Sequence, residues 1–280
     1  MGAKTGINKT LERLTGHVLV QSSSIEELRR KAAKANSKPR AAPKPKPKPK
    51  PKTKPLPADY DDEAKEIIRA VRPWTMTGAD KIYALIQAVR YVARHRIPGD
   101  VVECGVWRGG SMQAVARTLL SAGDTTRDLH LFDTYEGMPP PTDRDVRRSD
   151  ERTADELLAT ESRDESKVWA VATLEDVKDG FSRLPYPAER VHFVKGKVED
   201  TIPSHAPEQI SILRLDTDWY ESTKHELEHL YPRLSPGGVL LLDDYGYWEG
   251  AREAVDEFLE QSGERLLLMR MALGRLAVKP

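Results

Sequence analysis

The chain has 280 residues, of which 39% are hydrophobic and 31% are charged, and its 44 Lys and Arg residues balance its 44 Asp and Glu residues. This length suits one globular domain with additional segments, and the single cysteine, Cys104, excludes an intrachain disulfide framework. No segment resembles a signal peptide or forms an apolar run long enough to span a membrane, so a cytoplasmic protein is expected.

The neutral net charge conceals two oppositely charged parts. Residues 1–58 contain 15 Lys and Arg but 3 Asp and Glu, so that 29 of the 44 basic and 41 of the 44 acidic residues belong to 59–280. A basic arm is therefore attached to an acidic body. Because an acidic surface repels nucleic acid, nucleic acid is not expected to be the substrate of the main domain.

The basic arm is predicted to be a helical segment followed by an extended linker. Residues 1–37 have the pattern of short helices, and Ser24 with Glu27 fits a capping box at the start of the second one. Residues 38–58 alternate Lys with Pro, which favours a polyproline-II conformation stretched by charge repulsion. This linker is either a solvated tether or an anchor to an anionic surface or a protein partner.

Residues 59–280 have the pattern of a folded α/β domain. Helices are predicted at 59–72, 77–95 (with Thr77 as N-cap), 111–122, 174–184, 222–234 and 248–261. Strands are predicted at 100–106, 128–134, 190–196, 209–216 and 237–244, and two final strands, 265–271 and 274–280, are expected to pair antiparallel around a turn at Gly274. This alternation predicts an open, mostly parallel sheet with helices on both faces.

One connection is much longer than the others. About 40 residues, 134–173, separate the second strand from the next helix, and they contain a helix-like stretch at 153–160. Long connections in compact domains are usually either functional or disordered. The insertion is therefore a candidate lid or a disordered segment.

The first two strands end in residues suited to an adenosine-type cofactor. ECGVWRGGS follows the first strand, and its glycines let the backbone approach a ligand, although a tight turn explains them equally well. Asp133 closes the second strand, where an acidic side chain can bind ribose hydroxyls.

Two later strands end in carboxylates. Asp216 closes one strand, and Asp243 and Asp244 close the next, so all three are expected at one edge of the sheet. Two carboxylates ~4 Å apart repel each other by roughly 4 kcal/mol at an effective dielectric constant of ~20. Helix capping explains one such aspartate but not three together, whereas a Mg²⁺ ion does. Asp218 shares a face with Asp216 if the strand continues, and it is the predicted general base.

Four motifs give the chain a resemblance to a known family. ECGVWRGGS, LFDTYEGMP, LRLDTDWYEST and LSPGGVLLLDDYGYW resemble the macrocin O-methyltransferase family over roughly 60–278. The resemblance implies a Rossmann-like class I methyltransferase fold that uses S-adenosylmethionine and Mg²⁺ to methylate sugar hydroxyls in antibiotic biosynthesis. It implies Asp216, Asp243 and Asp244 as metal ligands and Asp218 as base. The implied cofactor contacts are Glu103, Gly105, Val106, Gly109, Ser111, Asp133, Val198 and Glu199. It also implies that Tyr135, Glu136 and Met138, in the loop after Asp133, contact the acceptor and that the insertion at 134–173 acts as a lid. Trp219 follows a strand end and is a further candidate for an acceptor contact.

Other functions stay open at this stage. A catechol-type phenol is the second candidate acceptor, since vicinal hydroxyls chelate Mg²⁺ in either case. HELEH at 225–229 is a literal H-E-x-x-H zinc motif, with Glu249 or Glu253 as third ligand, although a charged outer helix explains it better. A non-catalytic adenosine-binding module is the third candidate. The acceptor and a homo-oligomeric state are left open.

Overall fold

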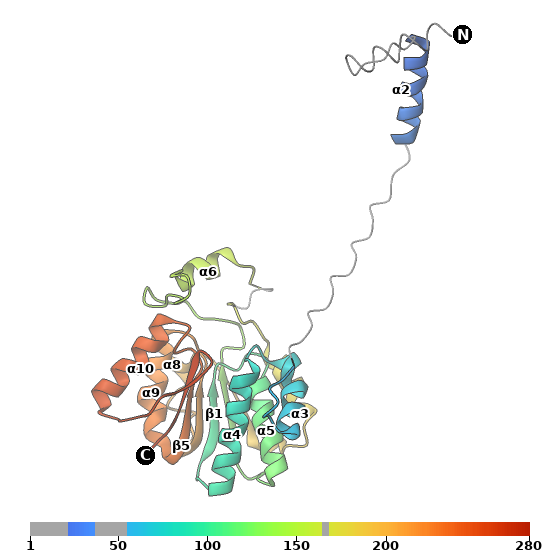
Figure 1. Cartoon of the computed structure of the whole chain (residues 1–280). Coiled ribbons are helices and arrows are strands. Elements are labelled where there is room, and N and C mark those ends of the chain that lie inside the picture. The colour runs from blue at the N-terminus through green and yellow to red at the C-terminus, as the bar shows by residue number, and fades with distance from the viewer. Residues whose placement is uncertain (1–21, 37–54, 164–167) are drawn as a thin grey trace. The chain divides into compact units, whose positions relative to one another are not determined.

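The computed structural model describes residues 22–36, 55–163 and 168–280 (Figure 1). The chain divides into two units, Met1–Lys54 and Pro55–Pro280. In the first unit, helix α2 spans Ser22–Asn36. Ser24 therefore lies within the helix, and its predicted role as N-cap is wrong. The helix predicted before α2 and most of the predicted linker fall outside the described residues.

A twisted sheet forms the centre of the second unit. Its described strands are β1 Asp100–Cys104, β2 Leu129–Asp133, β3 Val191–Lys195, β4 Ile210–Leu215, β5 Leu234–Leu242, β6 Met269–Met271 and β7 Gly274–Val278. They lie in the order β3-β2-β1-β4-β5-β7-β6. β1 to β5 are parallel, and β7 pairs antiparallel with both β5 and β6. The predicted mostly parallel sheet with a terminal antiparallel pair is confirmed.

Helices cover both faces of the sheet (Figure 1). The helices of this unit are α3 Asp62–Val71, α4 Ala79–His95, α5 Gly110–Ala122, α6 Ala154–Thr160, α7 Leu174–Ser182, α8 Val198–Thr201, α9 Tyr220–Leu230 and α10 Glu249–Ser262, with 3-10 turns η1 Arg72–Trp74, η2 Ala188–Arg190 and η3 Tyr231–Arg233. Of these, α6 lies beyond the end of the sheet and not on one of its faces (Figure 1). Alternate strand residues enter different cores, since Val101 packs with α4, α5 and α7, whereas Val102 packs with α8, α9 and α10. None of these helices is long and apolar enough to cross a membrane.

Several element boundaries differ from the sequence predictions. The N-cap of α4 is Gly78, because the Thr77 hydroxyl accepts a hydrogen bond from Arg214 instead. Helix α9 ends before Pro232, which lacks a backbone N–H, and β5 begins earlier than predicted. The turn between β6 and β7 is made by Ala272, whose φ is +53°, while Gly274 is already part of β7.

The described part of the predicted lid, 134–163 and 168–173, packs on the domain. The expected helix is present as α6, whose first turn is closed by a capping box of Thr153 and Glu156. Its Leu157 packs in a buried cluster with Trp219 and Trp248. The buried Asp145 of this segment accepts a hydrogen bond from the backbone N–H of Tyr220 at 2.7 Å. It thereby provides a partner for a backbone donor that has none within the first turn of α9.

Candidate active site

A cavity of about 340 Å³ opens at the carboxyl ends of the parallel strands. Residues that follow β1, β2, β4 and β5 line its floor. Thr77 and Lys81, at the start of α4, form one wall, and Met138 of the predicted lid lies at another. This position, beyond the ends of adjacent parallel strands, is where open α/β sheets bind ligands.

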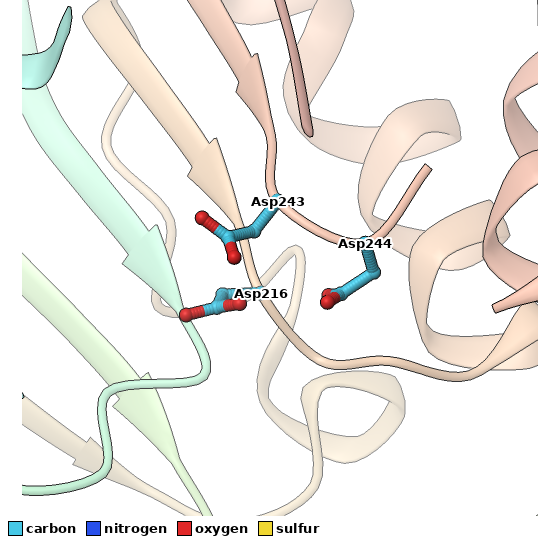
Figure 2. A group of neighbouring side chains, drawn as sticks. All are labelled: Asp216, Asp243 and Asp244. Carbon is cyan, nitrogen blue, oxygen red and sulfur yellow. The ribbon is translucent and has the colours of Figure 1, made fainter. Parts of the chain in front are cut away.

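Three carboxylates meet in this cavity (Figure 2). Asp216, Asp243 and Asp244 each offer one oxygen, and these oxygens lie within 4.8 Å of one another. They converge because β4 and β5 are parallel neighbours, with Leu215 paired to Leu242. The predicted convergence of these aspartates is confirmed.

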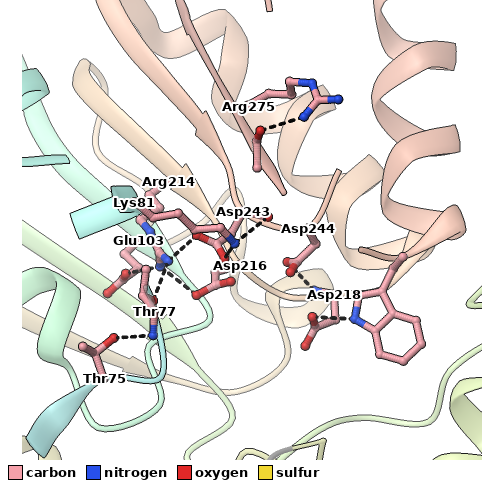
Figure 3. Close-up of polar contacts among 12 residues, drawn as sticks. Thr75, Thr77, Lys81, Glu103, Arg214, Asp216, Asp218, Asp243, Asp244 and Arg275 are labelled. Carbon is pink, nitrogen blue, oxygen red and sulfur yellow. Dashed lines mark hydrogen bonds and ion pairs between the residues drawn. The ribbon is translucent and has the colours of Figure 1, made fainter. Parts of the chain in front are cut away.

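A buried arginine joins this acidic cluster to β1 (Figure 3). The Arg214 side chain is 4% exposed. Its guanidinium contacts Glu103 at 2.6 Å, Asp216 at 2.8 Å and Asp243 at 2.7 Å. Burial alone would lower the pKa of Arg214, but these carboxylates hold that pKa well above its ordinary value. The guanidinium therefore holds together acidic side chains at the carboxyl ends of β1, β4 and β5.

A second cation approaches from α4. The ammonium of Lys81 contacts the Asp243 carboxylate and donates to the Asp243 carbonyl oxygen at 3.0 Å (Figure 3). Burial opposes ionisation of Asp243, but Arg214 and Lys81 together hold its pKa below the usual value. Four carboxylates, counting Glu103, thus face two cations, so the group carries a formal excess of two negative charges when every carboxylate is ionised.

The remaining two aspartates show the effect of this excess. Burial, and then the charges of neighbouring carboxylates, raise the pKa of Asp216 and of Asp244 well above the usual value. A bound cation would relieve both causes, because it replaces lost solvation and cancels repulsion.

Asp218 reaches the same site by a different route from the one predicted. Strand β4 ends at Leu215, and Asp218 has a φ of +67°, so the expectation that the strand carries it onto the face of Asp216 is wrong. Its backbone N–H instead donates to Asp244 at 3.2 Å, and its carboxylate accepts the indole N–H of Trp248 at 2.8 Å. Burial and the charge of Asp216 raise the pKa of Asp218 to about 7, a value suited to accepting a proton.

At the ends of β1 and β2, backbone groups rather than side-chain cations hold the carboxylate in place. The Asp133 carboxylate accepts the N–H groups of Val106 at 2.6 Å, Trp107 at 3.0 Å and Tyr135 at 2.7 Å. Gly105 has a φ of +81°, and a Cβ there would lie 1.9 Å from the Asp216 carbonyl oxygen. Glycine is therefore required for β1 and β4 to end side by side.

The predicted ligand contacts divide into two groups. Those on the cavity wall are Gly105, Asp133, Val198, Glu199 and Met138, together with Asp218 and the three clustered aspartates. The structure places the others outside the wall; they are Glu103, Val106, Gly109, Ser111, Tyr135, Glu136 and Trp219. Glu103 lies behind the wall against Arg214, and burial raises its pKa to about 7. Trp219 is 2% exposed and packs with Leu157 and Trp248.

The HELEH segment does not form a metal site. His225 bonds the Ile202 carbonyl oxygen at 3.0 Å, and His229 bonds the carbonyl oxygen of His225 at 2.8 Å. Glu226 is buried and accepts the Thr217 hydroxyl at 3.0 Å. Across 22–36, 55–163 and 168–280, the acidic cluster is the only group of three or more side chains arranged to hold a metal.

Sequence reasoning missed Arg214 and Lys81. A signal for Arg214 was present, because it is the one charged residue inside the apolar run ISILRL of β4. A charged side chain in a strand buried on both faces requires a partner. Lys81 gave no such signal, since a lysine in the first turns of an amphipathic helix is ordinary.

The model of the macrocin-O-methyltransferase family matches residues 14–269. The chain is 36% identical over 189 residues to the 8-demethyl-8-(2,3-dimethoxy-alpha-L-rhamnosyl)-tetracenomycin-C 4'-O-methyltransferase of Streptomyces olivaceus, which covers 68% of this chain and 69% of that protein. It is 36% identical over 190 residues to the mycinamicin III 3''-O-methyltransferase of Micromonospora griseorubida, and the match covers 68% of this chain and 71% of that protein. The solved structure of the O-methyltransferase NovP gives a TM-score of 0.63 at 30% identity, covering 74% of this chain and 82% of that one.

Proposed function

The chain belongs to the macrocin O-methyltransferase family and is an S-adenosylmethionine-dependent O-methyltransferase of class I fold, and we propose that it methylates a sugar hydroxyl of a glycosylated natural product. Support for the acceptor comes from the relatives: one is named for a rhamnosyl-tetracenomycin and another for mycinamicin III. Met138 and Pro139 of the long insertion line the same cavity, so this segment would contact the acceptor.

The proposal extends to a Mg²⁺ ion held by Asp216, Asp243 and Asp244. The observation that carries it is the acidic cluster itself, in which three carboxylate oxygens lie within 4.8 Å of one another. Their charge fits a divalent ion, because four carboxylates oppose only Arg214 and Lys81. Hard oxygen ligands at an open cavity suit Mg²⁺, which when bound would orient a hydroxyl and lower its pKa.

The chain's own residues would divide the remaining work. Asp218 would accept the proton of the acceptor hydroxyl, and the indole N–H of Trp248 would hold its carboxylate in position. The loop after β1, held by Asp133, would receive the cofactor together with Val198 and Glu199. The methyl group would pass by direct displacement from sulfonium to hydroxyl oxygen, so alignment of the two is the main requirement.

Calorimetry with S-adenosylhomocysteine, with and without Mg²⁺, tests the cofactor and metal assignments. We expect micromolar binding of S-adenosylhomocysteine, and a separate Mg²⁺ site that is lost in Asp244→Asn while cofactor affinity is retained. Mass spectrometry of products then compares a rhamnosylated polyketide with a catechol as acceptor. A protein that methylates only the catechol contradicts the sugar assignment, and one that binds no S-adenosylhomocysteine contradicts the whole proposal.

A further inference from the structure

Asp243 differs from the other members of the acidic cluster in its partners. Both of its carboxylate oxygens are paired with cations: Oδ1 contacts the Arg214 guanidinium at 2.7 Å, and Oδ2 contacts the Lys81 ammonium. The ammonium therefore lies on the oxygen that Asp243 would offer to a divalent ion. A direct metal contact at Oδ2 would bring two positive charges together within about 4 Å, where like charges repel strongly.

Arg214 cannot give way to such an ion. Its side chain is 4% exposed, and it has four partners, since it bonds Thr77 at 3.1 Å in addition to the three carboxylates. Moving it would leave buried carboxylates unpaired, and breaking a buried ion network is costly.

Lys81 has the opposite properties. Its side chain is 15% exposed, it lines the cavity, and both of its hydrogen bonds go to Asp243. A lysine carries its charge as a point on a flexible four-carbon stem, so its ammonium can leave one oxygen without disturbing the backbone. Of the two cations, Lys81 is the one that can be displaced.

We propose that Lys81 is a tethered cation that neutralises Asp243 when no divalent ion is bound and that a divalent ion displaces it from the carboxylate. This inference rests on the proposed cation site at Asp216, Asp243 and Asp244. Lys81 would therefore lower the affinity of the site, and it would keep the acidic cluster from repelling itself apart while the ion is absent. A lysine that only held Asp243 in position would have the reverse effect, because its loss would weaken ion binding.

Titration with Mn²⁺, followed by calorimetry and by the electron paramagnetic resonance signal of free Mn²⁺, distinguishes the two roles. Lys81→Met keeps the length of the side chain and removes its charge. We expect the Mn²⁺ affinity to rise about tenfold or more, because the repulsion between the ammonium and the ion is lost. Lys81→Arg retains a charge and should stay closer to the wild type. Lys197→Met is the matched control, because Lys197 is an exposed lysine on the wall of the same cavity.

A second measurement checks the ion-free state. Without Mn²⁺, Lys81→Met should melt at a lower temperature than the wild type, and added Mn²⁺ should raise its melting temperature by more than it raises that of the wild type. Equal or weaker Mn²⁺ affinity in Lys81→Met overturns the role of Lys81 while leaving the cation site intact. Absence of Mn²⁺ binding in the wild type and in every variant overturns the cation site and this inference together.

Discussion

Carboxylates close strands in two regions of the cavity, and they are neutralised in different ways. At the end of β2, Asp133 accepts three backbone N–H groups from loops that follow β1 and β2. At the ends of β4 and β5, Asp216 and Asp243 are met instead by the side-chain cations Arg214 and Lys81. Both regions lie at the same edge of one sheet.

The difference separates a part that shapes the cavity from a part that can exchange charge. Backbone N–H groups are fixed by the fold, so Asp133 holds the loop of Gly105–Trp107 in a single conformation. Side-chain cations can be displaced or supplemented, and the three carboxylates of the acidic cluster outnumber the two cations that meet them. We infer that the first region receives the cofactor and the second performs the metal and proton chemistry.

The largest expected effect tests whether the chemistry belongs to the second region. Asp218→Asn keeps the shape of the side chain but removes the proton acceptor, so turnover should fall by ~10²–10⁴, the usual scale for general base catalysis. Steady-state methyl transfer measures it. Mn²⁺ and S-adenosylhomocysteine affinities should change little, because neither is assigned to this carboxylate.

Asp143→Asn is the control for the loss of a carboxylate, because Asp143 is exposed in the segment that follows β2. This variant should turn over normally. Normal turnover in Asp218→Asn together with an inactive Asp216→Asn would mean that Asp218 is only a turn residue and that the base lies elsewhere.

The next effect concerns stability. Arg214→Met leaves three carboxylates without their shared cation, and unfolding by urea should show a loss of about 3–5 kcal/mol, the usual cost of breaking a buried ion pair. Arg252→Met is the matched control: Arg252 pairs with Asp256 at the surface, with the two side chains 41% and 49% exposed, so the change should be below about 1 kcal/mol.

If Arg214→Met does not fold, Arg214→Lys, which keeps the charge but not the fork, should fold with an intermediate loss. Stability equal to that of the wild type in Arg214→Met would show that the acidic cluster needs no buried counter-charge.

The smallest effect tests the first region. Asp133→Ala removes the acceptor of three N–H groups, which should cost about 1–3 kcal/mol of stability because water from the cavity replaces only part of the lost bonding. Calorimetry should show markedly weaker S-adenosylhomocysteine binding and unchanged Mn²⁺ binding. A parallel fall in Mn²⁺ affinity would mean that the two regions are coupled, and the division drawn between them would not hold.

Much of this arrangement could be predicted from local sequence. The strand–helix alternation, the antiparallel terminal pair and the helix at 153–160 follow from periodicity and capping, which involve neighbouring residues. The convergence of Asp216, Asp243 and Asp244 followed too, because strands that are adjacent and parallel end at the same edge. Asp218 joined the site as predicted, but through a turn with positive φ that its sequence pattern did not indicate.

The sequence by itself determined which residues close the strands, since that depends on where each apolar run stops. Only the tertiary structure decided what neutralises them. Arg214 meets Thr77 across 137 positions, and Lys81 meets Asp243 across 162. Such pairings depend on the sheet order and on how α4 lies over it, which no local pattern records. For the same reason Glu103, placed in sequence to touch a cofactor, lies behind the cavity wall, where Arg214 holds it.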